Sequence, residues 1–128
     1  MLNLSHLDRV FIIAEAGSNW KCGTFEEDLT QGKKLIDAAK SSGADAIKFQ
    51  TFKPASIYVQ DAGKSNYLSK QGIAESINDI FEHLSMPYEM IPELETYCKK
   101  KNIMFMSTPF SIQDAKAVDP YVEIHKIA

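Results

Sequence analysis

The stretch DAIKFQTF, residues 45–52, decides the fold class because it sets two long polar side chains inside the pattern of a buried strand. Lys48 and Gln50 are two residues apart, so a strand presents both on the same face. Polar side chains near the end of an otherwise apolar strand are typical of parallel α/β sheets, whose strand ends form ligand sites. We therefore ask whether the other strands of the chain end in the same way.

Strand and helix patterns alternate along the whole chain. Strands are predicted at 9–17, 44–52, 103–108 and 121–128, and helices at 25–43, 73–85, 89–102 and 109–120. Thr24 and Glu27 predict a capping box at the start of the first helix, and Gly43 is suited to its end. This alternation predicts a parallel sheet with right-handed helical crossovers. A (β/α) barrel and a doubly wound sheet both satisfy it.

Each predicted strand begins with apolar residues and finishes with a polar residue on one face. These polar residues are Glu15, Lys48 with Gln50, Thr108, and Lys126. Two lysines and a hydroxyl predict an anion site for phosphate or carboxylate. A carboxylate and an amide suit the hydroxyl and amide groups of a polar ligand. The sequence therefore predicts a phosphorylated or carboxylated small molecule bound beside a polyol.

The same residues also have purely structural interpretations. A lysine at a strand end often extends along the surface to water, and Glu15 could simply pair with one. Thr108 followed by Pro109 fits a helix N-terminus. His125 is expected to pack against a helix, and Trp20 suits either a ligand platform or a lid. The functional interpretation is favoured because all the predicted strands finish in a polar residue.

Composition narrows the class of protein. The 128 residues suffice for one domain, and 45% hydrophobic and 24% charged residues are ordinary for a globular protein. The net charge of −3 argues against a nucleic-acid partner. There is no apolar run long enough for a membrane helix and no signal-peptide pattern, so a cytoplasmic location is expected. Cys22 and Cys98 are far apart and are expected to stay reduced.

Several segments together resemble one enzyme family. They are IIAEAGSNW, GADAIKFQTF, MPYEMIPELETYCKKKNIMFMSTPF and HKIA, in this order, and they cover nearly the whole chain. They resemble the sialic acid synthases (N-acetylneuraminate synthases), which condense phosphoenolpyruvate with an N-acetylated amino sugar such as N-acetylmannosamine, giving a nonulosonic acid and phosphate for surface carbohydrates. The resemblance implies that residues 1–128 form the N-terminal half of a (β/α)8 TIM barrel.

The resemblance also implies roles for individual residues. Lys48, Thr108 and Lys126 would bind phosphoenolpyruvate. Gln50, Glu15 and Asn19 would contact the acceptor sugar, with Glu15 also catalytic. The family loop at Asn19 reads NHNG, whereas this chain reads NWKCG, with Trp20 in place of the histidine and one more residue. We therefore expect a sugar other than N-acetylmannosamine.

The length of the chain departs from the family. A barrel of this kind needs about 250 residues, so residues 1–128 are expected to be a fragment or a short product without the C-terminal half of the barrel or an antifreeze-like domain. The divalent metal of the family, manganese or magnesium, would belong to the full-length parent. Its histidine ligands are expected beyond Ala128, and neither His6, His83 nor His125 matches them.

Two alternatives therefore stay open for the function. One is a non-catalytic half-barrel that self-associates or binds an anionic metabolite. The other is a different phosphoenolpyruvate-dependent synthase of the aldol type. In either case a homo-oligomer is expected, because the strands at the two edges of a half-barrel lack neighbours.

Overall fold

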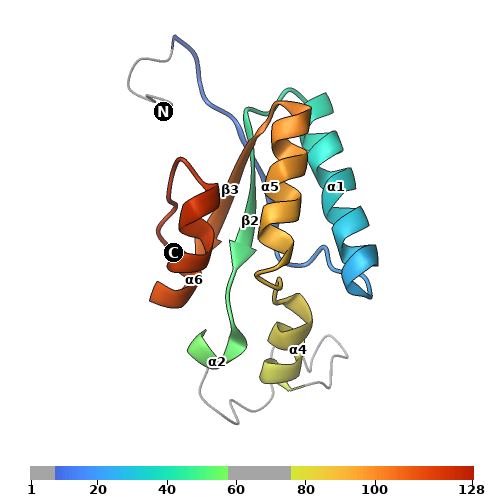
Figure 1. Cartoon of the computed structure of the whole chain (residues 1–128), viewed down its shortest axis with the longest axis vertical. Coiled ribbons are helices and arrows are strands. Elements are labelled where there is room, and N and C mark those ends of the chain that lie inside the picture. The colour runs from blue at the N-terminus through green and yellow to red at the C-terminus, as the bar shows by residue number, and fades with distance from the viewer. Residues whose placement is uncertain (1–7, 58–75) are drawn as a thin grey trace, which may run out of the picture.

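The computed structural model describes residues 8–57 and 76–128, which form a parallel sheet covered by helices (Figure 1). The strands are β1 (Ile13–Gly17), β2 (Ala46–Thr51) and β3 (Met104–Pro109), in the order β1-β2-β3. The helices are α1 (Phe25–Ser41), α2 (Pro54–Ile57), α4 (Ile77–Leu84), α5 (Met90–Lys101), α6 (Ile112–Val118) and the 3-10 turn η2 (Asp119–Tyr121). The predicted parallel α/β class is confirmed. The first three residues of the helix predicted at 73–85 lie outside the described residues.

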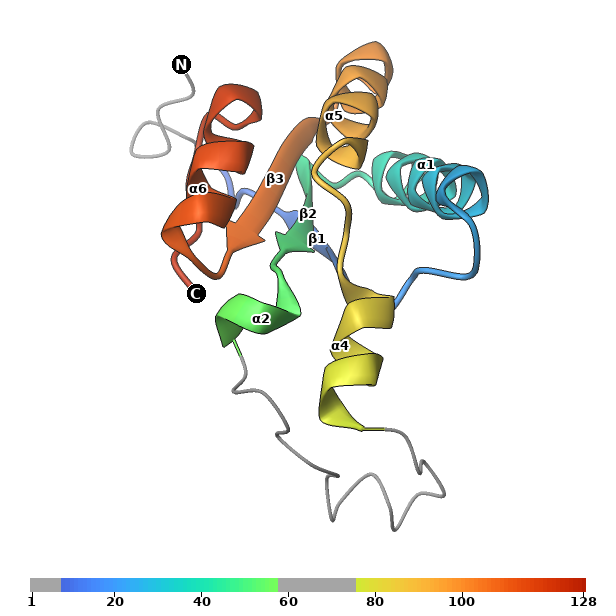
Figure 2. The ribbon, with the colours of Figure 1, turned by 60° about the horizontal axis from the view of Figure 1, so that its bottom comes forward.

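Helices α1 and α5 lie side by side over one face of the sheet (Figures 1 and 2). The core lies between them and the strands, where the rings of Phe49 and Phe105 stack with centroids 5.8 Å apart. Helix α1 begins with the predicted Thr24–Glu27 capping box. Gly43 follows its last turn with a φ of 82°, a conformation that favours glycine.

Trp20 belongs to this core and is neither a ligand platform nor a lid. Its side chain is 8% exposed and meets the ring of Phe49 edge to face at 5.5 Å. The indole N–H donates to the Gly17 carbonyl at 3.2 Å. Gly32 of α1 leaves room for the indole and for Leu94 of α5, because a Cβ at this glycine would lie 2.8 Å from the Leu94 Cδ2. The indole therefore fixes the loop after β1 to the core.

The predicted fourth strand is wrong. After η2, residues 122–128 form no strand, and the sheet of the described residues has three strands instead of about four. A fourth strand here would pair on one side only, which removes half of its possible ladder hydrogen bonds. The His125 Nε2–H donates a hydrogen bond to the Asp119 carboxylate at 3.0 Å, which holds the segment against its own turn. His125 is thus exposed, and the expectation that it packs against a helix is also wrong.

Candidate functional site

The strand register brings the predicted polar residues to the carboxyl end of the sheet. Glu15 of β1 lies opposite Lys48 of β2, and Gln50 of β2 lies opposite Thr108 of β3. Neighbouring strands present opposed residues on the same face, so the four side chains share one face. The core residue Phe49 lies on the other face, which α1 and α5 cover.

Lys48 is the centre of this group. Its ammonium forms an ion pair with Glu15 and lies 3.4 Å from the hydroxyl oxygen of Thr108. The second carboxylate oxygen of Glu15 accepts a hydrogen bond from the Gly17 N–H at 3.0 Å. The Lys48 side chain is only 12% exposed, whereas that of Glu15 is 52% exposed. The arrangement is a half-buried cation whose carboxylate partner faces water and can exchange for another anion.

The remaining predicted residues are placed less directly. Gln50 is half-buried next to Lys48 on the same strand face, and Asn19 is exposed in the turn that follows β1. Lys126 is exposed in the segment that forms no strand, so the strand register that aligns the other residues does not extend to it. Thr108 is buried at the end of β3. The structure thus brings Glu15, Lys48, Gln50 and Thr108 to one face at the carboxyl end of the sheet, and their role as a ligand site stays a prediction.

Sequence reasoning missed a buried acid beneath the loop that carries Asn19. Asp28 in the first turn of α1 accepts hydrogen bonds from the N–H groups of Cys22 at 2.6 Å and Gly23 at 3.0 Å. The Lys21 ammonium lies 3.6 Å from the same carboxylate. An acid in the first turn of a helix is common because it interacts favourably with the helix dipole. The position of Asp28 in the sequence therefore did not indicate that it also binds the N–H groups of the preceding loop.

A second buried acid orders the chain after β3. Asp114 accepts hydrogen bonds from the hydroxyls of Tyr88 and Ser111, both at 2.6 Å. Burial, and then the bond to this carboxylate, raise the pKa of Tyr88 to about 12. The Lys53 ammonium lies 4.4 Å from the centre of the Tyr88 ring. These contacts connect the segment after β2 with the linker before α5 and with α6.

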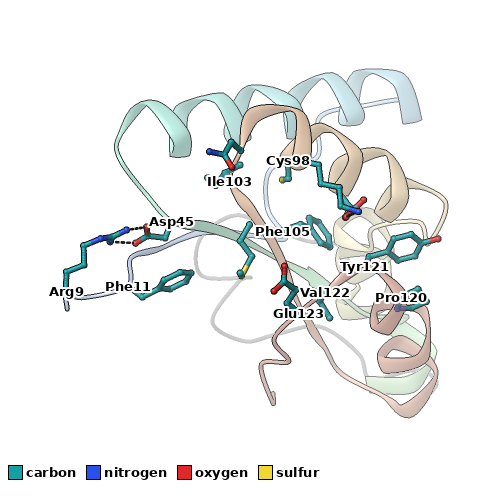
Figure 3. A pocket seen from close by; sticks show the side chains of 14 residues that line it. Arg9, Phe11, Asp45, Cys98, Ile103, Phe105, Pro120, Tyr121, Val122 and Glu123 are labelled. Atoms are coloured by element: carbon teal, nitrogen blue, oxygen red, sulfur yellow. Dashed lines mark hydrogen bonds and ion pairs between the residues drawn. The ribbon is translucent and has the colours of Figure 1, made fainter. Parts of the chain in front are cut away.

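A cavity of about 540 Å³ lies elsewhere, at the amino end of β3 (Figure 3). Its walls include Phe11, Met104, Phe105 and Val122. Its charged groups are largely paired with one another, as Arg9 is with Asp45. Active sites of parallel α/β folds lie at the opposite, carboxyl end of the strands. The cavity follows the edge of β3 where a further strand would lie, and we do not assign the candidate site to it.

The described residues offer no metal centre. Nowhere in residues 8–57 and 76–128 do three histidine, cysteine, aspartate or glutamate side chains come together to hold an ion. The metal implied by the family resemblance therefore does not fit this part of the chain, and no step is derived through it. In the same ranges, no helix is long and apolar enough to cross a membrane.

The parallel sheet, its helical crossovers and the polar group at its carboxyl end define a parallel α/β fold of the kind whose ligand sites lie at the strand ends. The model of the NeuB family matches residues 35–128, which is most of the chain. Relatives of known name also exceed 30% identity over more than two thirds of the chain. The chain therefore belongs to the NeuB family.

Two of the relatives have names that state a biosynthetic role. The spore coat polysaccharide biosynthesis protein SpsE of Bacillus subtilis is 42% identical over 99 residues, which are 77% of this chain and 25% of the relative. The N,N'-diacetyllegionaminic acid synthase of Campylobacter jejuni is 38% identical, over 84% of this chain and 31% of that protein. This chain thus spans about a quarter to a third of these relatives.

A solved structure shows the same arrangement. The crystal structure of the N-acetylneuraminic acid synthetase of Leptospira borgpetersenii, in complex with citrate, superposes with a TM-score of 0.74 and 27% identity. The match covers 98% of this chain and 40% of that one. The likeness confirms the predicted fold class, the N-terminal half of a synthase barrel.

Proposed function

We propose that this chain provides the phosphoenolpyruvate-binding part of a synthase that makes a nonulosonic acid. The reaction would join phosphoenolpyruvate to the aldehyde carbon of an N-acetylated amino sugar, consume water and release phosphate. The observation that carries the proposal is the half-buried Lys48, held between Glu15 and Thr108 at the carboxyl end of the sheet. The synthase names of the relatives give the reaction class.

The chemistry of the group suits this reaction. Lys48 and the Thr108 hydroxyl would hold the phosphate or carboxylate of phosphoenolpyruvate, so that charge and orientation are set before reaction. Glu15 and Gln50 would receive the hydroxyl and amide groups of the sugar, and Glu15 is the candidate general base. Asn19 would add a further contact from the turn after β1. Lys126 joins the proposed ligands only if its segment moves to the site.

A divalent metal, where the full-length parent holds one, would supply Lewis-acid chemistry toward the sugar aldehyde. The described residues of this chain contribute binding of the anion and orientation of the sugar. We therefore expect the purified 128-residue chain to bind phosphoenolpyruvate without turning it over. Phosphate release that depends on both manganese and an amino sugar would contradict this expectation.

Titration of the labelled chain with phosphoenolpyruvate, followed by amide NMR, tests the proposal. We expect shifts at Glu15, Lys48 and Thr108, and a loss of affinity of about tenfold or more in Lys48→Met, the size expected when one bond from a charged donor is lost. Lys34→Met is the matched control, because it removes the same charge from an exposed position on α1. Shifts confined to the cavity at the amino end of β3 would overturn the proposal.

A further inference from the structure

Three segments that follow strands or helices at the carboxyl end of the sheet are joined by a chain of buried polar contacts. The segments are the loop 18–24 after β1, the end of β2 at Phe52, and the linker 85–89 between α4 and α5. None of these contacts touches the Lys48 group directly. The link begins at Lys21, a residue to which neither the proposed function nor the pattern of strand ends assigns a role.

Lys21 makes the first contact of this chain. Its ammonium donates a hydrogen bond to the Ser85 carbonyl at 2.9 Å, across 64 residues of sequence, and lies 3.6 Å from the buried Asp28 carboxylate. The Lys21 side chain is 17% exposed. A half-buried ammonium held by a carboxylate and a carbonyl is costly to release, because its partners would stay buried without it. The contact is therefore stronger than a surface ion pair.

Ser85 continues the chain to β2. Its buried hydroxyl donates to the Phe52 carbonyl at 2.8 Å, immediately after the last residue of the strand. The Phe52 ring is fully buried and meets Phe81 of α4 and Phe110 after β3 edge to face, at 5.9 and 5.7 Å. The linker is thus fixed on one side to the loop after β1 and on the other to the end of β2.

We propose that Lys21 is a positioning residue that sets the loop after β1 relative to the end of β2. The inference rests on the proposed function, in which Asn19 of that loop and Gln50 of β2 contact the same sugar. Trp20 packs against Phe49 and so fixes the loop to the core. Lys21 donates to the Ser85 carbonyl and so fixes the same loop to the linker. Phosphoenolpyruvate, held by Lys48 and Thr108 on the strands themselves, does not depend on this link.

The test compares Lys21→Met with Lys21→Arg and with the matched control Lys34→Met. Arginine keeps a donor to the carbonyl and the carboxylate. Ser85→Ala is a second variant, which removes the contact between the linker and β2 while leaving the Ser85 carbonyl in place. Two measurements are made on each variant. One is amide hydrogen exchange along the chain, and the other is NMR titration with phosphoenolpyruvate and with a panel of N-acetylated hexosamines (N-acetylmannosamine, N-acetylglucosamine and N-acetylgalactosamine).

In Lys21→Met we expect exchange to rise about tenfold in residues 18–23 and 85–88 and to stay near wild type in β2 and β3, the pattern of a local opening. The affinity for the hexosamine of this panel that the wild type binds most tightly should fall about tenfold, the size of one lost hydrogen bond to a charged group, while that for phosphoenolpyruvate stays within about twofold. Ser85→Ala should raise exchange in the same segments and weaken sugar binding in the same way. Lys21→Arg should keep exchange and sugar affinity close to wild type, and Lys34→Met should change neither.

Unchanged exchange in both segments of Lys21→Met would overturn the inference, as would equal losses of affinity for both ligands in step with global stability. The proposed function fails separately, if the wild-type chain binds neither ligand. In that case the exchange measurement still decides whether Lys21 holds the loop to the linker.

Discussion

Lys48 already has a carboxylate partner before any ligand arrives. An incoming anion must share or displace Glu15, which is the more exposed member of the pair. The ion pair therefore lowers the affinity of Lys48 for an incoming anion. It also supplies the half-buried ammonium with a counter-charge when no ligand is bound. The geometry is therefore compatible with both interpretations of Glu15 and Lys48, a structural ion pair and part of an anion site.

We predict that Glu15→Gln binds phosphoenolpyruvate more tightly than the wild type, by about two- to fivefold. The gain is modest because water screens a carboxylate that is half exposed. Titrations at low and high salt check it, since the gain should shrink as salt rises. Weaker binding in this variant would show that Glu15 contacts the ligand rather than competing with it.

The two cysteines should differ sharply in reactivity. Burial raises the pKa of the Cys98 thiol to about 12, so almost none of it is thiolate at neutral pH. Cys22 is exposed in the loop after β1. Ellman's reagent should modify one thiol in the folded chain and two after denaturation. Cys22→Ser should remove the fast reaction, and a fast reaction that persists in this variant would contradict the burial of Cys98.

At the scale of the elements, the patterns in the sequence correctly predicted β1, β2, β3 and the helices between them, but they wrongly predicted a further strand at 121–128. The helical spacing of apolar residues and the residues at the helix ends determine α1 and α5 from local sequence. Strand β2 is an apolar run, and its hydrogen-bonding partners are β1 and β3. The residue pattern of 121–128 fits a strand as well as that of β2 does. A strand forms only where a neighbouring strand can accept and donate its hydrogen bonds, and the local residue pattern does not show whether such a neighbour is present. Lys126 was misplaced for that reason. The strand-end pattern did predict the Glu15, Lys48 and Thr108 group, because adjacent parallel strands share a register.

Gly32 lies where α1 packs against Leu94 of α5, and a Cβ there would come within 2.8 Å of the Leu94 Cδ2. We expect Gly32→Ala to destabilise the chain by about 1 kcal/mol. Alanine gains about 1 kcal/mol of helix propensity, but overpacking against the buried Leu94 and Trp20 costs about 1–3 kcal/mol. Urea unfolding measures the difference. Thr30→Ala, on the exposed face of the same helix, should be neutral or slightly stabilising. A stabilised Gly32→Ala would show that the two helices can separate at little cost.

The segment before β1 is held by Asp45, which explains why the chain reaches the sheet in register. The side chain of Arg9 and then the Ile12 N–H lower the pKa of Asp45 to about 2. A carboxyl group with a lowered folded pKa stabilises the fold above its unfolded value near 4. This contribution should disappear as the pH falls from about 4 to about 2. Urea midpoints of wild type and Asp45→Asn should therefore differ at pH 6 and converge near pH 2; a constant difference would contradict this.

At the scale of the whole molecule, the sheet is open at both sides within the described residues. β1 and β3 each pair only with β2 there. Beside β1 the apolar side chains of Val10, Ile12 and Ile13 are 78%, 53% and 42% exposed, and the cavity follows β3. Unpaired edges with apolar side chains favour association.

We therefore predict a dimer or larger species at micromolar concentration, measured by sedimentation velocity. Ile12→Lys, which places a charge beside the edge of β1, should shift the chain toward monomer. Ile112→Lys, on the exposed face of α6, is the matched control and should leave the distribution unchanged. A monodisperse wild-type monomer that melts cooperatively would contradict the prediction.

The order β1-β2-β3 is also the order in which a ribosome makes the strands. Each strand can pair with the strand synthesised just before it, so β1 and β2 can pair while α5 and β3 are still inside the ribosome or not yet made, and only the β3 side of β2 then lacks a partner. At about 5–20 residues per second, the face that α5 will cover stays uncovered for a time on the order of seconds. We therefore expect nascent chains to gain structure stepwise from the N-terminus, with the face of β2 that bears Phe49 incompletely covered until α5 is made.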